Sequence, residues 1–227
     1  MITLVFSGSK GGTGKTTLAV SLAIVSSSVA STLLIDASAE GGATAYLLGD
    51  VPPPYLREDP PSSVRRVEGD TLNLFVAVNR GPLANSYLVA ENVRKWSQEF
   101  MLVIIDLPAL TDSDAVDRYL PLILESHSIL IVTEPNPASM ESALYTFSGK
   151  RLVVALNCPR PYPKSVVEHY SKVVASFCKR VNADYVTVPY EPAVSRLSPS
   201  TLRVLDYTGS EYDAAIAKLV NLLLRSK

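Results

Sequence analysis

The sequence has little cysteine and histidine. Its two cysteines, Cys158 and Cys178, form no C-x-x-C pair of the kind that builds zinc or iron–sulfur sites. The two histidines, His127 and His169, are isolated, and we interpret both as structural. We therefore expect structural thiols in a reducing compartment, and a redox function is disfavoured.

Long apolar runs and an excess of positive charge are also missing. No apolar run approaches the roughly 20 residues that a membrane span needs, and residues 1–9 contain no basic region of the kind that begins a signal peptide. The net charge of -1 means that nucleic-acid binding would need a local basic patch. We expect a soluble, cytoplasmic protein.

What the chain does contain is a set of short apolar runs separated by stretches with helical spacing. Its 227 residues, 47% of them hydrophobic, suffice for one α/β domain, and we expect a single domain spanning 1–227. Most runs are continuous rather than alternating, which is typical of strands buried between helices. The runs are 2–6, 32–35, 72–78, 101–105, 128–132, 152–156 and 185–188. This order predicts a doubly wound, mostly parallel sheet with helices on both faces.

One segment interrupts this alternation. Residues 51–63 contain five prolines, which cannot donate backbone hydrogen bonds and are disfavoured inside helices and central strands. We expect this segment to be a surface excursion.

The strongest motif is the nine-residue run S-K-G-G-T-G-K-T-T, from Ser9 to Thr17. It follows the first predicted strand directly and opens a helix, as a phosphate-binding loop does. Glycines in such a loop let backbone N–H groups point at phosphate oxygens. Lys15 is then expected to reach the β and γ phosphates, and the Thr16 hydroxyl to bind Mg²⁺. The predicted nucleotide-binding residues are Gly11, Gly12, Thr13, Gly14, Lys15, Thr16 and Thr17.

The loop departs from the common G-x-x-x-x-G-K-[ST] pattern, because Ser9 occupies the first glycine position. The variant K-G-G-x-G-K-[ST] fits completely. This variant resembles the signature of the ParA/MinD family of deviant Walker A P-loop ATPases. The resemblance implies ATP and Mg²⁺ as ligands, hydrolysis of ATP to ADP and phosphate, and a homodimer when ATP is bound. It implies catalytic roles for Lys15 and for Lys10, which would cross the dimer interface to the partner's nucleotide.

Two acidic strand ends also resemble that family. The run L-L-I-D ending at Asp36 resembles the switch I strand, and the resemblance makes Asp36 a catalytic residue and a candidate for the Mg²⁺ water shell. The run L-V-I-I-D-L-P resembles Walker B and switch II, with Asp106 holding Mg²⁺ through water. Four apolar residues precede Asp106, which places its carboxylate at the carboxyl end of a buried strand, where open α/β sheets bind ligands. The predicted metal residues are therefore Thr16, Asp36 and Asp106.

Two further stretches resemble the base-binding strand ends of the family. They are V-A-L-N, ending at Asn157, and V-P-Y-E-P, which contains Pro189. The resemblance implies that Asn157 contacts adenine and that Pro189 belongs to the nucleotide site.

The sequence departs from the family after the second strand. Family members usually read D-x-D-P-Q-G-N there, with the second aspartate assisting the attacking water, whereas this chain has Ser38 at that position. A hydroxyl can orient water but cannot take a proton at neutral pH, and losing one such group can cost on the order of 10²- to 10⁴-fold in rate. We expect slow hydrolysis. Glu40, two residues on, could act as a substitute.

Within the family, the run that begins at Asp106 is closer to the D-x-P-P-x-L of partition ATPases than to the run of MinD. We therefore favour a ParA-like role in plasmid or chromosome partition, with nonspecific DNA and a centromere-binding protein as expected partners. Neutralising DNA phosphates requires surface lysines and arginines. The candidate groups are Arg94 with Lys95, Lys179 with Arg180, and Arg196 with Arg203.

Three alternatives remain open. A MinD-like positioning ATPase would carry a terminal amphipathic anchor, and residues 214–227 have an apolar stripe, although such a stripe usually faces the core and membrane binding is not expected. The second alternative is an ATP-binding module with negligible turnover, because Ser38 lacks the carboxylate. The third is a metabolic ligase on the same fold, against which Lys10 argues.

Overall fold

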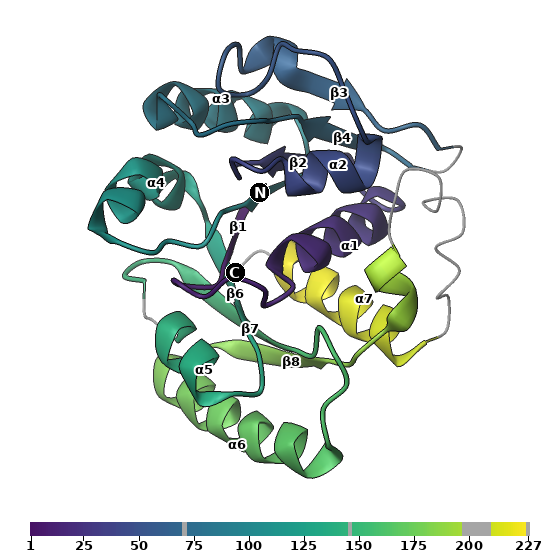
Figure 1. Ribbon diagram of the computed structural model, residues 1–227, viewed down its shortest axis with the longest axis vertical. Coiled ribbons are helices and arrows are strands. Elements are labelled where there is room, and N and C mark those ends of the chain that lie inside the picture. Colours follow the sequence, from purple (N-terminus) through teal and green to yellow (C-terminus); the bar gives the residue numbers. More distant parts are fainter. Residues whose placement is uncertain (70–71, 145–146, 197–209, 226–227) are drawn as a thin grey trace.

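The fold is built on one sheet of eight strands (Figure 1). The computed structural model describes residues 1–69, 72–144, 147–196 and 210–225. Across the sheet the strand order is β3-β4-β2-β5-β1-β6-β7-β8, and β3–β4 is the antiparallel pair. The strands are β1 Ile2–Phe6, β2 Thr32–Asp36, β3 Val64–Arg66, β4 Leu74–Ala77, β5 Leu102–Asp106, β6 Ser128–Thr133, β7 Arg151–Asn157 and β8 Asp184–Val188. The predicted doubly wound, mostly parallel sheet is confirmed.

Helices cover both faces of this sheet. They are α1 Lys15–Ser27, α2 Gly42–Leu48, α3 Ser86–Glu99, α4 Ser113–Glu125, α5 Pro137–Ala143, α6 Lys164–Val181 and α7 Glu211–Leu224, with short 3₁₀ turns at Pro61–Ser63 and Pro192–Arg196. One apolar core joins the sheet to α1, α2 and α7, and the other joins it to α3, α4, α5 and α6. Successive residues of a strand point to opposite faces of the sheet. Leu4 therefore packs in the core with α3 to α6, and Val5 packs in the core with α1, α2 and α7.

Burial explains why the strands read as continuous apolar runs. All five residues of β1, β2 and β5 are buried, and each fully buried aliphatic side chain contributes about 1.5–3 kcal/mol relative to an exposed one. Each of the seven predicted runs overlaps an observed strand. The eighth strand, β3, was not predicted, because three residues are too short for a periodicity signal.

The proline-rich segment 51–63 crosses the surface as expected, but it is not loosely attached. Leu56 in its middle is fully buried, and the Leu56 N–H donates to the Val78 carbonyl at 2.8 Å. The segment is therefore fastened beside the end of β4.

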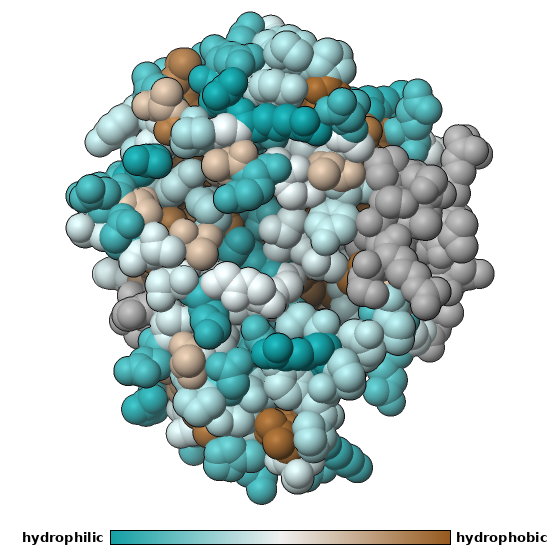
Figure 2. All heavy atoms as spheres, viewed as in Figure 1, coloured by the Kyte–Doolittle hydropathy of each residue, from teal (hydrophilic) through white to brown (hydrophobic). Residues whose placement is uncertain are grey.

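The apolar stripe of the last helix faces inward. Ile216, Leu219 and Leu223 of α7 are fully buried in the core that α7 shares with α1. Figure 1 shows these two helices side by side. This confirms the expectation that the stripe faces the core; Lys227 lies outside the described residues. Among the described residues, no helix has the length and apolarity to cross a bilayer. On the face shown in Figure 2, hydrophilic residues predominate and apolar ones occur in small groups.

Candidate functional site

The loop between β1 and α1 has the backbone shape of a phosphate cradle. Gly12 and Gly14 both have φ of 77°, which side-chain-bearing residues rarely adopt. A Cβ on Gly14 would also lie 2.4 Å from the Asn157 amide nitrogen. The Ser7 hydroxyl donates to the Lys10 carbonyl at 3.2 Å and closes the loop. Glycine at position 14 is thus required both by conformation and by space.

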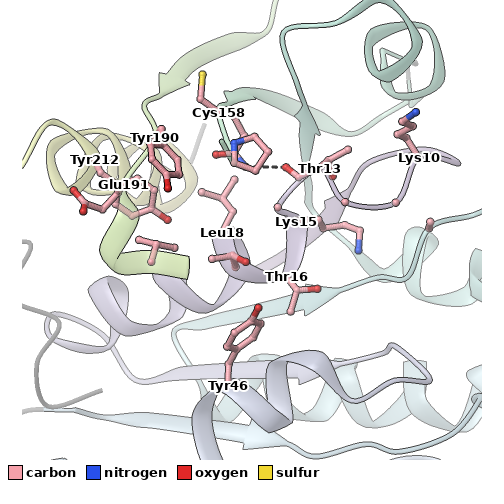
Figure 3. A pocket seen from close by; sticks show the side chains of 18 residues that line it. Lys10, Thr13, Lys15, Thr16, Leu18, Tyr46, Cys158, Tyr190, Glu191 and Tyr212 are labelled. Carbon is pink, nitrogen blue, oxygen red and sulfur yellow. Dashed lines mark hydrogen bonds between the residues drawn. The ribbon is translucent and has the colours of Figure 1, made fainter. Parts of the chain in front are cut away.

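This loop forms the floor of a cavity of about 420 Å³. All predicted loop residues from Lys10 to Thr17 line it, together with Leu18, Tyr46, Ala109, Asn157, Cys158, Pro159, Tyr190, Glu191, Val194 and Tyr212. Figure 3 shows Tyr190, Glu191 and Tyr212 gathered at one end of the loop, and Lys10 at the other. The cavity therefore has a cationic, glycine-rich part and an aromatic part. Tyr46 and Tyr212 were not predicted, because each lies in a helix far along the chain from the loop.

The two residues predicted to flank the base lie differently. Asn157 lines the cavity, and its amide donates to the Thr13 carbonyl at 2.8 Å, so it also supports the loop from below. Pro189 lines a neighbouring surface hollow instead, although Tyr190 next to it lines both.

Lys15 and Asp106 form the ionic centre of the site. Lys15 Nζ lies 3.7 Å from Asp106 Oδ1, and the Asp106 side chain is fully buried. Neither carboxylate oxygen of Asp106 accepts a hydrogen bond from any described residue. Burial raises the pKa of Asp106 to about 6, and the nearby Asp36 adds to the rise, whereas Lys15 and the Thr16 side chain oppose it.

Asp36 lies beside Asp106, because β2 and β5 pair in register and these two residues are Cα partners. Its carboxylate has a different environment. Oδ1 accepts hydrogen bonds from the Ser38 N–H at 3.2 Å and the Ser38 hydroxyl at 2.7 Å. Oδ2 accepts two more, from the N–H and the hydroxyl of Thr44, both at 2.8 Å. Burial raises the pKa of Asp36, and these four bonds oppose the rise.

Ser38 and Glu40 lie in the β2–α2 loop, residues 37–41. Ser38 is buried, and its hydroxyl is directed at Asp36 rather than lining the cavity. Glu40 is exposed and lies outside the cavity lining.

Residues missed by sequence reasoning hold this loop. The fully buried Asn79, just after β4, donates from its amide to the Ser38 carbonyl at 2.8 Å and the Gly81 carbonyl at 3.1 Å. The Tyr119 hydroxyl of α4 donates to the Ala37 carbonyl at 3.1 Å. No sequence signal marked either residue, since both contacts join segments distant in the chain.

A third buried acid lies at the same carboxyl end of the strands. Glu134, directly after β6, accepts hydrogen bonds on Oε2 from the Arg160 guanidinium at 2.9 Å and from the Tyr162 hydroxyl. Its side chain is 4% exposed, whereas that of Arg160 is 66% exposed. This cluster fastens the loop after β7, which contributes Pro159 to the cavity.

Two of the three basic pairs proposed for DNA lie on α3 and α6, outside the cavity lining. Arg94 of α3 is exposed and already paired with Glu125 of α4, and Lys95 is exposed beside it. Lys179 and Arg180 are exposed in the last turn of α6. The side chain of Arg196 and the whole of Arg203 lie outside the described residues.

The residues present suit a magnesium ion held mainly by nonprotein oxygens. In the described part of the chain, no group of three or more His, Cys, Asp or Glu residues could hold a metal. The buried oxygens of Asp106 lack hydrogen-bond donors, and water molecules around Mg²⁺ would supply them. Mg²⁺ commonly keeps several waters and takes one or two protein ligands plus phosphate oxygens, which fits Asp106 together with the Thr16 hydroxyl.

Comparison with known proteins supports this fold. No protein-family model and no curated protein matches the chain, but solved structures match nearly all of it. A variant of McdA from Cyanothece in complex with ATP has a TM-score of 0.76 and 20% identity, over 100% of this chain and 98% of that one. The septum site-determining protein MinD from Pyrococcus horikoshii, in complex with Mg-ADP, has a TM-score of 0.73 and 16% identity, over 98% of this chain and 95% of that one.

A plasmid partition protein from Borrelia burgdorferi is similar as well, with a TM-score of 0.68 and 15% identity over 98% of this chain and 97% of that one. At these identities the likeness establishes the fold. The chain has the P-loop NTPase fold that MinD, McdA and plasmid partition proteins share.

Proposed function

We propose that this chain is a Mg²⁺-dependent ATPase of the ParA/MinD family, switched between monomer and dimer by ATP. The observation that carries the proposal is the cavity lined by residues Lys10 to Thr17, beside the ionic pair of Lys15 and Asp106. The ligands of the neighbouring structures, ATP in McdA and Mg-ADP in MinD, support ATP and Mg²⁺ as the ligands here.

The residues of the site divide the work of binding and hydrolysis. Backbone N–H groups of residues 11–16 and the start of α1 bind the phosphates, and Lys15 neutralises their charge. The Thr16 hydroxyl and Asp106 would hold Mg²⁺, whose charge would offset the negative charge of the phosphates. Tyr46, Tyr190 and Tyr212 provide apolar surface for the base, beside Asn157.

Lys10 carries the dimer part of the proposal. It is exposed at the rim of the cavity, and in Figure 3 its side chain points away from Lys15. A cation in this place can reach a nucleotide held by a second copy. ATP would then close the dimer, and hydrolysis to ADP and phosphate would open it.

A ParA-like role in plasmid or chromosome partition is the cellular function that we propose. Exposed basic pairs such as Lys179 with Arg180 could contact DNA without sequence preference, and a centromere-binding protein would be the partner. The MinD-like alternative has equal support from the fold, because MinD and partition proteins match about equally well.

A second candidate function, an ATP-binding module with negligible turnover, is favoured by one observation. The Ser38 hydroxyl is engaged with Asp36 at 2.7 Å, so the loop presents no carboxylate at that position for the attacking water. Steady-state phosphate release separates this module from a slow ATPase.

The dimer is tested by light scattering. With ATP and Mg²⁺ the wild-type protein should have twice the mass that it has with ADP, and Lys10→Ala should remain monomeric. Lys172→Ala, which removes an exposed lysine of α6, is the matched control and should dimerise. A wild-type protein that stays monomeric in saturating ATP would refute the switched dimer.

A further inference from the structure

We propose that the two neighbouring carboxylates of the site have separate tasks. Asp36 is a structural clasp, meaning that its hydrogen bonds hold the β2–α2 loop in place, and of the two acids only Asp106 serves the Mg²⁺ ion. This inference rests on the proposed function for its magnesium part. It departs from the expectation that Asp36 belongs to the metal's water shell, and it assigns Ser38 a role in the clasp.

The acceptor capacity of Asp36 is already used. An ionised carboxylate offers about four lone-pair positions, and Asp36 accepts four hydrogen bonds, two on each oxygen. All four donors belong to Ser38 and Thr44. A water molecule around a metal ion would have to displace one of these donors, and each hydrogen bond to a charged group is among the stronger ones in proteins.

The donors are themselves fixed. Each hydroxyl has one proton, which it gives to Asp36, and its oxygen accepts a backbone N–H: that of Gly42 at 3.3 Å for Ser38, and that of Asn79 at 3.1 Å for Thr44. The network therefore joins the end of β2, the start of α2 and the segment after β4. A serine at position 38 can take part because it donates a proton, which an ionised aspartate cannot do.

Three carbonyls of the same loop are tied down from outside. Those of Ala37 and Ser38 accept from Tyr119 and Asn79, and the Ala39 carbonyl accepts the Gly81 N–H at 2.7 Å. The loop is thus held on both sides by contacts within the protein. Asp36 is the centre of this arrangement, because its carboxylate is the common acceptor for both ends of the loop.

Asp106 provides the contrast within the same pair of strands. It is equally buried, yet its two oxygens accept no hydrogen bond from a described residue. The nearest cation, Lys15 Nζ, is 3.7 Å away. Open acceptors next to the phosphate loop are what a hydrated cation requires, and Asp106 has them.

The experiment measures the affinity for ADP by calorimetry, with and without Mg²⁺, and the melting temperature of each variant. Asp106→Asn should lose the Mg²⁺-dependent gain in affinity. Asp36→Asn, Ser38→Ala and Thr44→Val should keep that gain within about twofold, yet each should lower Tm by about 5 °C or more, as expected for lost hydrogen bonds to a buried charge. Thr44→Ser, which keeps the hydroxyl, should restore Tm.

The outcomes separate the two proposals. If Asp36→Asn reduces the Mg²⁺-dependent gain as much as Asp106→Asn does, Asp36 serves the metal and the inference is wrong. If Asp36→Asn does not fold, Ser38→Ala and Thr44→Val decide through their melting temperatures, and a Tm equal to that of the wild type in both would refute the clasp. If the wild-type protein binds no ADP at all, the proposed function fails and the magnesium part fails with it, while the melting temperatures still decide the clasp.

Discussion

Asp36 and Asp106 lie side by side at the carboxyl ends of β2 and β5, and comparing them shows how one sheet edge can hold two acids for different purposes. Both are fully buried, so both pay the same kind of desolvation cost. Four hydrogen bonds compensate Asp36, whereas Asp106 accepts none of that geometry and has Lys15 at 3.7 Å and the Thr16 side chain nearby. An acid compensated by its own chain holds structure, and one left partly uncompensated is available to a ligand.

The largest expected effect on this pair of acids comes from removing Lys15. Lys15→Ala takes away both the counter-charge of Asp106 and the group that meets the phosphates. We expect the affinity for ADP with Mg²⁺ to fall on the order of 1000-fold, about 4 kcal/mol. Lys172→Ala, which removes an exposed lysine of α6, should bind ADP like the wild type. A loss of less than tenfold in Lys15→Ala would place the phosphates elsewhere.

The next largest effect is expected in how the stability of the folded protein depends on pH, because Asp106 has a raised pKa. The pKa of Asp106 is about 6 in the folded protein, against an ordinary value of 3.8, so the folded state holds its proton more tightly than the unfolded state. Stability should therefore fall as pH rises from about 4 to about 6 and level off above, by about 3 kcal/mol. Urea unfolding of ligand-free protein across this range measures it.

Asp106→Asn is the control for that measurement. Its asparagine does not titrate, so its stability should lack this fall and exceed that of the wild type most at neutral pH. Parallel pH profiles for the two proteins would contradict the raised pKa.

The smallest expected effect comes from converting Ser38 to the aspartate that ParA/MinD proteins usually have at the corresponding position. Ser38→Asp would place a second carboxylate where the hydroxyl now lies 2.7 Å from Asp36, and it would remove a donor at the same time. We expect a loss of about 2 kcal/mol in the free energy of unfolding.

Ser38→Asn, of equal size but able to donate, should lose less. If Ser38→Asp were as stable as Ser38→Asn and hydrolysed ATP faster than the wild type, position 38 would be a water site and the clasp would be wrong.

Much of the fold and the phosphate loop could be predicted, because both are encoded locally. Continuous apolar runs marked seven strands, and the glycine pattern marked the loop from Ser9 to Thr17. The environment of Asp36 could not be predicted, since Thr44 and Asn79 reach it only after α2 and β4 have packed. The resemblance to ParA/MinD proteins indicated that Ser38 stands where they usually have an acid, but not that its hydroxyl turns toward another acid.

The unpredicted strand β3 has a consequence for how copies of this chain can meet. An open sheet exposes unpaired backbone groups at its edges, and these can recruit further chains into aggregates. At this edge the strand is only three residues long and carries Arg65 and Arg66, and the Arg65 guanidinium is bonded to the Ser62 and Val64 carbonyls. Growth of the sheet from β3 into a neighbouring molecule is thereby discouraged, which leaves side-chain surfaces as the means of association at this end of the molecule.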